Sequence, residues 1–254
     1  MRALPSAHII PRIPTFCYTA SVGLLDFIFP KYCVGCKRLG SYICPNCFAY
    51  ISFDVERICV ECNRPCFNGL THPGCKKRDS IEGVFPCIKY VGVVKKLLYS
   101  FKYNPYVVDL RKPLGELFYE GLIQQEEFMK VMEQLNRKTI VLVPIPLHAS
   151  RFRVRGYNQS ELLAKDLGKK FGIPVAHLLV RVKKTPTQVG LKQKERRENI
   201  SGAFEVRITD EELRSQAVFL VDDVLTSGAT LAEATRILKK SGVRKVWGLT
   251  LARD

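Results

Sequence analysis

The sequence predicts an α/β fold in which a parallel sheet is flanked by helices, with a small cysteine-rich module ahead of it. Two observations carry this prediction. Beyond residue 85, short apolar runs alternate with longer segments of helical periodicity, and this order favours a parallel sheet with right-handed crossovers. Before that point, eight of the ten cysteines fall between Cys33 and Cys75. The chain of 254 residues is long enough to bury a substantial core.

The expected strands are short, apolar and rich in β-branched residues, which is typical of strands buried on both faces. They cover residues 86–91, 139–143, 217–221 and 245–251. Apolar residues at helical spacing predict helices over residues 93–101, 108–132, 160–171 and 231–240. Gly172 is the expected stop of the third helix, because glycine readily adopts a left-handed backbone.

Three parts are expected along the chain. They are an N-terminal segment with a short helix over residues 1–30, a metal-binding module over 31–80 and an α/β domain over 81–254. No apolar run reaches the roughly 20 residues that a membrane span needs. The first 17 residues also lack the apolar core of a signal peptide. We therefore expect a cytoplasmic protein without a membrane span.

The cysteines have the spacing of metal-binding knuckles. A Cys-x2-Cys pair places two thiolates on one side of a tight turn, as tetrahedral zinc requires. The simplest division makes two consecutive ribbons, whose ligands are Cys33, Cys36, Cys44, Cys47, Cys59, Cys62, His72 and Cys75. We therefore expect two structural zinc ions.

Three alternatives stay open for this module. Cys66 could replace His72 as a ligand of the second ribbon. The pairs could also be cross-braced, so that Cys33 and Cys36 share a metal with the pair at residues 59 and 62. Disulfides are the third alternative, but they need an oxidising compartment, and nothing in the sequence indicates export.

An acidic pair follows the apolar run 217–221. Asp222 and Asp223 stand at the carboxyl end of this expected strand, ahead of a short polar loop and a helix. Ligands of open parallel sheets bind at this edge, and the acidic pair suits a sugar diol or a hydrated magnesium ion. Free N–H groups at a helix N-terminus favour an anion. A phosphate therefore suits the loop residues Thr226, Ser227, Gly228, Ala229 and Thr230.

Two basic segments complete the candidate site. Residues 144–159 form an expected loop after a strand, where arginine forks match phosphate oxygens. The first choices in this loop are Arg151, Arg155 and Asn158. Residues 181–204 are typical of a basic flap over an anionic site, or of a loop that follows a nucleic-acid backbone. The flap candidates are Lys184, Gln188, Arg196 and Arg197.

The net charge of the chain is +16, from 40 basic and 24 acidic residues. This balance favours phosphate-rich partners such as nucleotides or single-stranded nucleic acid. Phe152 and Tyr157 lie among the arginines and could stack on bases, although packing is the expected role of each.

The order of strand, Asp-Asp, apolar pair, Thr-Ser-Gly-Ala-Thr and helix resembles the phosphoribosyl-pyrophosphate (PRPP) motif of type I phosphoribosyltransferases. The resemblance implies a type I phosphoribosyltransferase-like parallel sheet. It further implies that Asp222 and Asp223 hold the ribose hydroxyls, that residues 226–230 surround the 5′-phosphate, and that Mg²⁺ accompanies PRPP.

The chain resembles the ComF/ComFC family. The resemblance rests on this motif, the cysteine module, the Arg-x-Arg-x-Arg-Gly-Tyr-Asn-Gln segment and the flap. The similarity covers roughly residues 24–254. That family joins a double zinc ribbon to a phosphoribosyltransferase-like domain, which implies handling of incoming DNA in bacterial competence. His72 departs from the pattern, since many members have a cysteine there.

Two functions follow from these features. The first is a PRPP- or ribose-5-phosphate-binding protein that handles incoming single-stranded DNA with the uptake machinery, any transferase activity being residual. The alternative is an active phosphoribosyltransferase that transfers the phosphoribosyl group of PRPP to a nucleobase or amine. No residue stands out as recognising a particular base, so the sequence leaves the acceptor unassigned.

Overall fold

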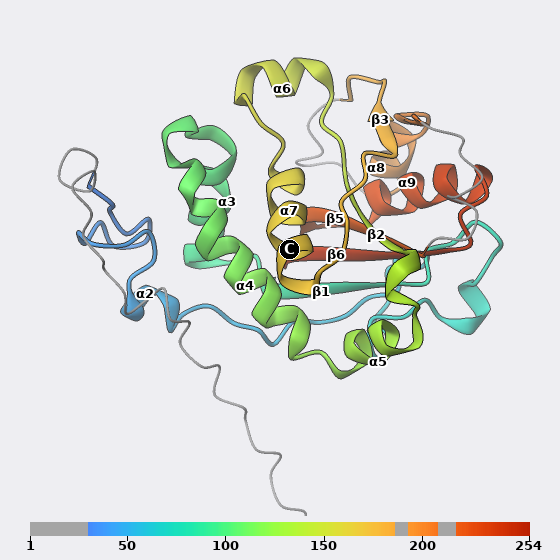
Figure 1. The fold of residues 1–254 in the computed structure, drawn as a ribbon, viewed down its shortest axis with the longest axis horizontal. Coiled ribbons are helices and arrows are strands. Elements are labelled where there is room, and N and C mark those ends of the chain that lie inside the picture. The colour runs from blue at the N-terminus through green and yellow to red at the C-terminus, as the bar shows by residue number, and fades with distance from the viewer. Residues whose placement is uncertain (1–29, 186–192, 208–216) are drawn as a thin grey trace, which may run out of the picture.

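The computed structural model describes residues 30–185, 193–207 and 217–254, and its centre is a four-stranded sheet surrounded by helices (Figure 1). The sheet has the order β1-β6-β5-β2, with β1 (Gly83–Lys89), β2 (Ile140–Pro144), β5 (Ala217–Leu225) and β6 (Lys245–Arg253). All three neighbouring pairs are parallel. The expected α/β class with a parallel sheet is therefore confirmed.

Helices cover both faces of this sheet. One face carries α3 (Gly92–Tyr103), α4 (Arg111–Ile123), α5 (Glu126–Gln134) and α7 (Gln159–Phe171), and the other carries α9 (Ala229–Lys240). The shorter elements are α2 (Pro45–Phe48), α6 (Ala149–Arg155), α8 (Gln193–Ile200), the antiparallel pair β3 (Leu179–Arg181) and β4 (Phe204–Val206), and the 3₁₀ helices η2 (Pro73–Cys75), η3 (Pro105–Leu110) and η4 (Arg137–Thr139).

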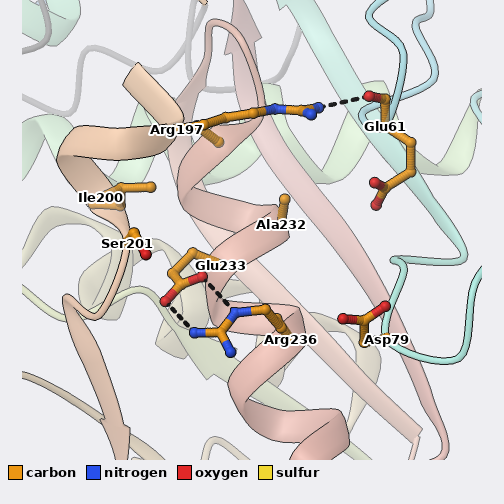
Figure 2. Close-up of a pocket in the computed structure, with 9 residues that line it drawn as sticks. Glu61, Asp79, Arg197, Ile200, Ser201, Ala232, Glu233 and Arg236 are labelled. Carbon is orange, nitrogen blue, oxygen red and sulfur yellow. Dashed lines mark hydrogen bonds and ion pairs between the residues drawn. The ribbon is translucent and has the colours of Figure 1, made fainter. Parts of the chain in front are cut away.

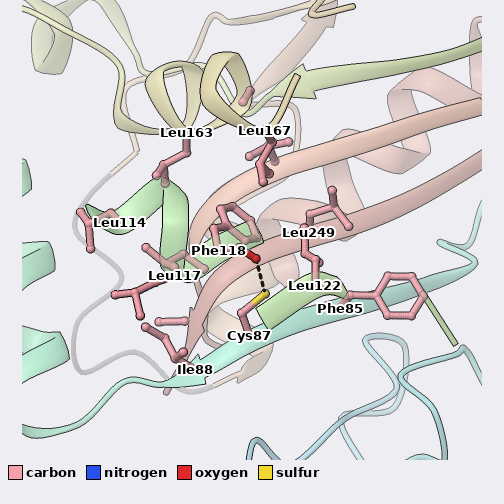
Figure 3. Close-up of a cluster of buried hydrophobic side chains, with 14 of the residues drawn as sticks. Phe85, Cys87, Ile88, Leu114, Leu117, Phe118, Leu122, Leu163, Leu167 and Leu249 are labelled. Atoms are coloured by element: carbon pink, nitrogen blue, oxygen red, sulfur yellow. Dashed lines mark hydrogen bonds between the residues drawn. The ribbon is translucent and has the colours of Figure 1, made fainter. Parts of the chain in front are cut away.

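The strands are apolar along most of their length because both of their faces are buried. All five residues of β2 are buried. On one face, Phe85 and Leu249 pack with Phe118 of α4 and the leucines of α7 (Figure 3). On the other face, Val218 and Leu220 pack beneath α9. Burial of this apolar surface fixes the register of the sheet and with it the edge that holds the candidate site.

The single helix expected over residues 108–132 is wrong. The chain forms α4 and then α5, with an extended backbone at Gln125 (φ −91°, ψ 106°) between them. The buried side-chain amide of Gln125 donates to the carbonyl of Pro86 at 3.1 Å and to that of Gly121 at 2.9 Å. The Gln125 amide N–H groups therefore bond both to β1 and to the end of α4 at the break, although the apolar pattern of the sequence continues through it.

The expected stop at Gly172 is confirmed. Gly172 has φ 68°, in the left-handed region, at the C-terminal end of α7. Its N–H group donates to the carbonyl of Gly168, which satisfies one of the last free carbonyls of the helix.

The two cysteine groups lie at different places on the α/β body (Figure 1). Residues 33–47 lie beside the start of α3, where Lys96 Nζ donates to the carbonyl of Gly35 at 3.4 Å. Residues 59–75 lie beside β1 and α9, and Val60 belongs to the apolar cluster of the α9 face. Each group therefore packs on its own part of the α/β body.

Some expectations fall outside the described residues. The short helix expected within residues 1–30 belongs to this set, as does Gln188 of the basic flap. Within the ranges that the structure describes, no helix combines the length and the apolar character needed to cross a membrane.

Candidate functional site

The acidic pair lies inside β5. The strand expected over residues 217–221 continues to Leu225, because Val224 and Leu225 still pair with β6. The predicted end of the strand is therefore four residues too early. Asp222 and Asp223 lie within the strand, near its carboxyl end, and the prediction that they follow it is wrong. Their backbone is held by the sheet, which fixes the carboxylates more firmly than a loop would.

Lys102 of α3 reaches this pair from the neighbouring helix. Its Nζ lies 2.8 Å from Asp223 Oδ1, and the two side chains are 20% and 12% exposed. Burial acts to lower the pKa of Lys102, but the carboxylates of Asp223 and Asp222 outweigh it and hold that pKa above its ordinary value. One of the two acidic charges is therefore already neutralised by the protein.

Asp222 makes a different set of contacts. Its Oδ1 accepts from Ser160 Oγ at 3.0 Å and from the N–H group of Asp223 at 2.9 Å. Burial, followed by the neighbouring Asp223 carboxylate, raises the pKa of Asp222 to about 7. Ser160 lies in the first turn of α7, so the pair is held between α3 and α7.

The expected phosphate loop leads from β5 into α9. Gly228 is the N-cap of α9 with φ 72°, and the helix begins at Ala229. The free N–H groups of this first turn can receive an anion. The Ser227 side chain is 6% exposed, and its buried hydroxyl has no partner among the described residues. An unsatisfied hydroxyl beside a helix N-terminus fits a ligand that carries acceptor oxygens.

The second cysteine group forms the wall behind this loop. A Cβ atom added at Gly228 would lie 2.7 Å from Val60 Cγ1, which is closer than side-chain carbons approach. Val60 is 1% exposed and stands between Cys59 and Cys62. The cysteine knuckle and the loop are therefore in direct contact.

The arginine-rich segment expected as a loop forms the short helix α6 instead. His148 caps its start, because the imidazole Nδ1 accepts from the N–H group of Ser150 at 3.2 Å. Gly156, with φ 78°, ends it. Both caps are local features, and α6 has no buried residues that would give its sequence an apolar periodicity. The sequence therefore predicted a loop here.

Arg151, Arg155 and Asn158 all lie on or just after α6. Arg151 Nη2 donates to the carbonyl of Thr185 at 3.0 Å, at the base of the flap. Burial, followed by the charge of Arg155, lowers the pKa of Arg151. The buried amide of Asn158 donates to the carbonyl of Ile145 and accepts from the N–H group of Ser160. Asn158 therefore caps α7, and the two arginines remain the phosphate candidates here.

The flap residues take separate positions. Lys184 is exposed, and Arg196 and Arg197 lie on α8. Arg197 Nη2 donates to the carbonyls of Val60 and Glu61 at 2.8 and 2.6 Å. Arg197 therefore attaches α8 to the second cysteine group.

Figure 2 shows the cavity at this junction, where α8, α9 and the second cysteine group meet. Its volume is about 290 Å³. Arg236 and Glu233 of α9 form an ion pair at 2.7 Å within it, and Arg197, which donates to the carbonyl of Glu61, also lines it (Figure 2).

The structure brings together the eight predicted metal ligands as two groups of four. In each group, the ligand atoms lie within 4.8 Å of one another; the groups are Cys33, Cys36, Cys44, Cys47 and Cys59, Cys62, His72, Cys75. The pairing is consecutive rather than cross-braced, and Cys66 is not in the second group. Four sulfur and nitrogen donors at such separations fit tetrahedral zinc. The cysteine region therefore fits a double zinc ribbon.

Local contacts favour the thiolate form of one ligand. Burial acts to raise the pKa of Cys33, but backbone N–H groups, first that of Cys44, outweigh it and lower the pKa to about 6. The N–H group of Cys44 lies 3.5 Å from Cys33 Sγ. In the second group, His72 Nδ1 lies 3.3 Å from Cys62 Sγ. The imidazole thus occupies the ligand position that the sequence left open.

Comparison with known proteins agrees with this architecture. The family described as "Phosphoribosyl transferase domain" matches residues 127–253, which include β2, α7, β5 and α9. The fold and this match define a protein with a phosphoribosyltransferase domain.

The relatives of the chain narrow that class. Competence protein F of Haemophilus influenzae is 31% identical over 228 residues, covering 87% of this chain and 90% of the relative. Competence protein ComFC of Bacillus subtilis is 36% identical over 226 residues, covering 84% of each chain. DNA utilization protein YhgH of Salmonella typhi is 34% identical over 111 residues, covering 42% of this chain and 48% of the relative. The chain belongs to the ComF/ComFC family.

Lys102 and Ser160 were not among the predicted site residues. A signal for Lys102 was present, since it follows Leu98 by four residues on the buried stripe of α3. A charged residue on such a stripe needs a buried partner. Ser160 gave no comparable signal, because a serine in the first turn of a helix is ordinary.

Proposed function

We propose that the protein binds PRPP, or a nucleotide with a similar 5′-phosphorylated ribose, at the carboxyl end of β5. The observation that carries this proposal is the placement of the acidic pair beside a glycine-capped helix N-terminus with an unsatisfied serine hydroxyl. Asp222 and Asp223 would hold the ribose hydroxyls, and Thr226, Ser227, Gly228, Ala229 and Thr230 the 5′-phosphate.

The pyrophosphate of PRPP would lie toward α6. Arg151 and Arg155 supply planar donor forks there, and their charge neutralises phosphate oxygens. Carboxylate oxygens are donors that Mg²⁺ prefers, so the acidic pair fits a hydrated Mg²⁺ that arrives with the pyrophosphate. Lys184, Gln188 and Arg196 of the flap are proposed to approach the same anion.

A role in handling incoming single-stranded DNA is the second part of the proposal. Relatives over most of the chain are named competence proteins, and others are named DNA utilization proteins. The net charge of +16 suits a nucleic-acid backbone. We retain three further predictions from the sequence. They are contacts with the uptake machinery, a cytoplasmic location, and domain boundaries at residues 30 and 80.

Two zinc ions are proposed to hold the cysteine groups. Bound zinc supplies folding free energy to a segment that has few aliphatic residues. The eight ligands would then be structural, and the chemistry of the sheet edge would not involve them.

Active phosphoribosyl transfer is the alternative function. The domain match and the near-neutral pKa of Asp222 support it, since a carboxyl group that titrates near pH 7 can accept a proton. In that case, the arginines of α6 would stabilise the departing pyrophosphate.

The proposal is tested by titrating PRPP with Mg²⁺ into the full chain in a calorimeter. We expect Asp222→Asn/Asp223→Asn to weaken binding at least tenfold, because the ribose contacts are lost. Asp109→Asn is the matched control, since that carboxylate is 56% exposed and belongs to η3. Equal affinity in the wild-type protein and the double variant contradicts the ribose site.

The DNA role is tested in parallel by the anisotropy of a labelled oligothymidylate. Its affinity should fall steeply with salt and survive Asp222→Asn/Asp223→Asn. A flat salt response contradicts the DNA role. Release of pyrophosphate from PRPP with any member of a panel of bases selects the transferase alternative.

A further inference from the structure

Two exposed tyrosines of α3 lie in contact with each other. Tyr99 is 65% exposed and Tyr103 is 55% exposed. Their ring centroids are 4.9 Å apart, with the planes inclined at 44°. Phe219 and Trp247 form a comparable pair, but their rings are buried in the core. The tyrosine pair is instead exposed at the surface, where burial in the core does not account for it.

Arg155 of α6 lies over one of these rings. Its Cζ is 5.0 Å from the centroid of Tyr103, and its Nη2 is 3.4 Å from the tyrosine hydroxyl. Nη1 donates to Gln159 Oε1 at 3.0 Å, which holds the guanidinium in place. Phe152, one turn earlier in α6, is 46% exposed. We call Tyr99, Tyr103, Phe152 and Arg155 the aromatic patch.

The aromatic patch and the proposed ribose site are connected through α3. Lys102 directly precedes Tyr103 in this helix, and its Nζ lies 2.8 Å from Asp223 Oδ1. Arg153 is a further exposed cation on α6. An occupant of this surface must therefore offer flat rings for the tyrosines and negative charge for the arginines. Unpaired bases on a phosphate backbone meet both requirements.

We propose that the aromatic patch is a stacking platform for the bases of single-stranded DNA. This inference rests on the proposed DNA role and adds to it the surface that would bind the strand. Tyr99 and Tyr103 stack on bases, and Phe152 extends the platform along α6. Arg155 contributes charge to the backbone while its plane lies against Tyr103.

Tyr157 shows why the other aromatic candidate of this region is not part of the platform. Its hydroxyl donates to the carbonyl of Phe101, and its ring packs on the Phe101 ring at 5.8 Å between centroids. Of the two aromatic residues that the sequence places among the arginines, only Phe152 is therefore exposed for stacking.

The test compares Tyr99→Ala/Tyr103→Ala with the wild-type full chain, using two labelled oligonucleotides of equal length. One is oligothymidylate, and the other is an abasic strand with the same phosphates. Loss of one stacked base weakens binding by about fivefold or more. We therefore expect at least that loss for oligothymidylate and less than a twofold change for the abasic strand.

Three controls accompany the test. Tyr50→Ala removes an 81% exposed tyrosine of the first cysteine region and should change neither affinity. Tyr99→Phe/Tyr103→Phe should retain binding, because stacking needs the rings and not the hydroxyls. Thermal unfolding and zinc content establish that each variant is folded.

The outcomes separate this inference from the proposed function. Equal loss on both strands, or no loss on either, overturns the platform while the wild-type protein still binds DNA. No binding of oligothymidylate by the wild-type protein overturns the DNA role itself. Because Arg155 contacts Tyr103 and is also proposed to bind pyrophosphate, PRPP binding is measured on Tyr99→Ala alone, and its retention shows that the pocket is intact.

Discussion

At Lys102, one side chain sets the charge of the candidate ribose site. Its ammonium group lies 2.8 Å from Asp223 Oδ1, while Asp222 bonds to Ser160 and to the backbone. Two adjacent buried carboxylates would otherwise repel each other and lose hydration. The ammonium offsets this cost, and a ligand that binds here meets a site whose charge is already balanced in part.

Lys102→Met should lower the free energy of unfolding by about 2 to 3 kcal/mol, since it leaves the Asp223 carboxylate buried without a partner. Lys102→Met/Asp223→Asn should recover most of that loss. Urea unfolding of the three proteins measures both values.

Lys112→Met is the matched control for this prediction. Lys112 lies 3.9 Å from Asp109, but the two side chains are 71% and 56% exposed. Its removal should cost less than about 1 kcal/mol. Equal losses for the two lysine variants would contradict a special role for Lys102.

Among the elements, the loop between β5 and α9 is the most tightly constrained. Gly228 adopts φ 72°, and Val60 of the second cysteine group fills the space beside it. The loop is therefore fixed both by its own backbone and by contact with a segment far away in sequence. A preformed loop binds an anion without first losing conformational entropy.

Gly228→Ala should destabilise the protein by about 1 to 3 kcal/mol more than Gly172→Ala. Both glycines have a left-handed φ, near 70°, but a Cβ at Gly172 meets no atom within 4 Å. The difference between the stability losses of the two variants therefore measures the effect of the contact with Val60. Thermal unfolding measures it, and calorimetry should show weaker PRPP binding for Gly228→Ala alone.

Adding Val60→Ala to Gly228→Ala provides the check. The smaller side chain removes the overlap, so part of the stability and of the PRPP affinity should return. If the double variant is no more stable and binds PRPP no more tightly than Gly228→Ala, the second cysteine group does not position the loop.

The sequence was most informative for elements with a strong local pattern. The apolar run at residues 139–143 predicted β2, and the order of residues 217–240 predicted a strand, loop and helix, although the strand end was four residues too early. Local pattern failed at α6, whose caps are polar, and at Gln125, whose side chain bonds to β1. Lys102 was missed because its partner lies 121 residues away in sequence.

In the whole molecule, the two cysteine groups have different neighbours. The spacing of the ligands predicted the grouping, but it held no information on where each group packs. The first lies against α3, and the second contacts both α8 and the loop between β5 and α9. Metal in the two groups should therefore have different effects on the pocket.

Cys62→Ser and Cys36→Ser provide a matched pair of variants. Each should lose one of about two zinc ions, as measured by elemental analysis. Only Cys62→Ser should weaken PRPP binding, severalfold or more, because Val60 then loses its support. An equal effect of both variants on PRPP affinity would contradict the coupling of the second group to the loop.

The apolar residues next to the cysteines have a consequence for how the chain can be divided. Ile43 and Phe48 are buried with α3 and α4, and Ile58 and Val60 are buried with α9. A fragment that begins at the sheet would expose the surfaces these side chains cover, and exposed apolar surface promotes aggregation. Truncation at the start of the sheet would therefore cut through shared hydrophobic cores, so the chain should be expressed and purified as one cooperative folding unit.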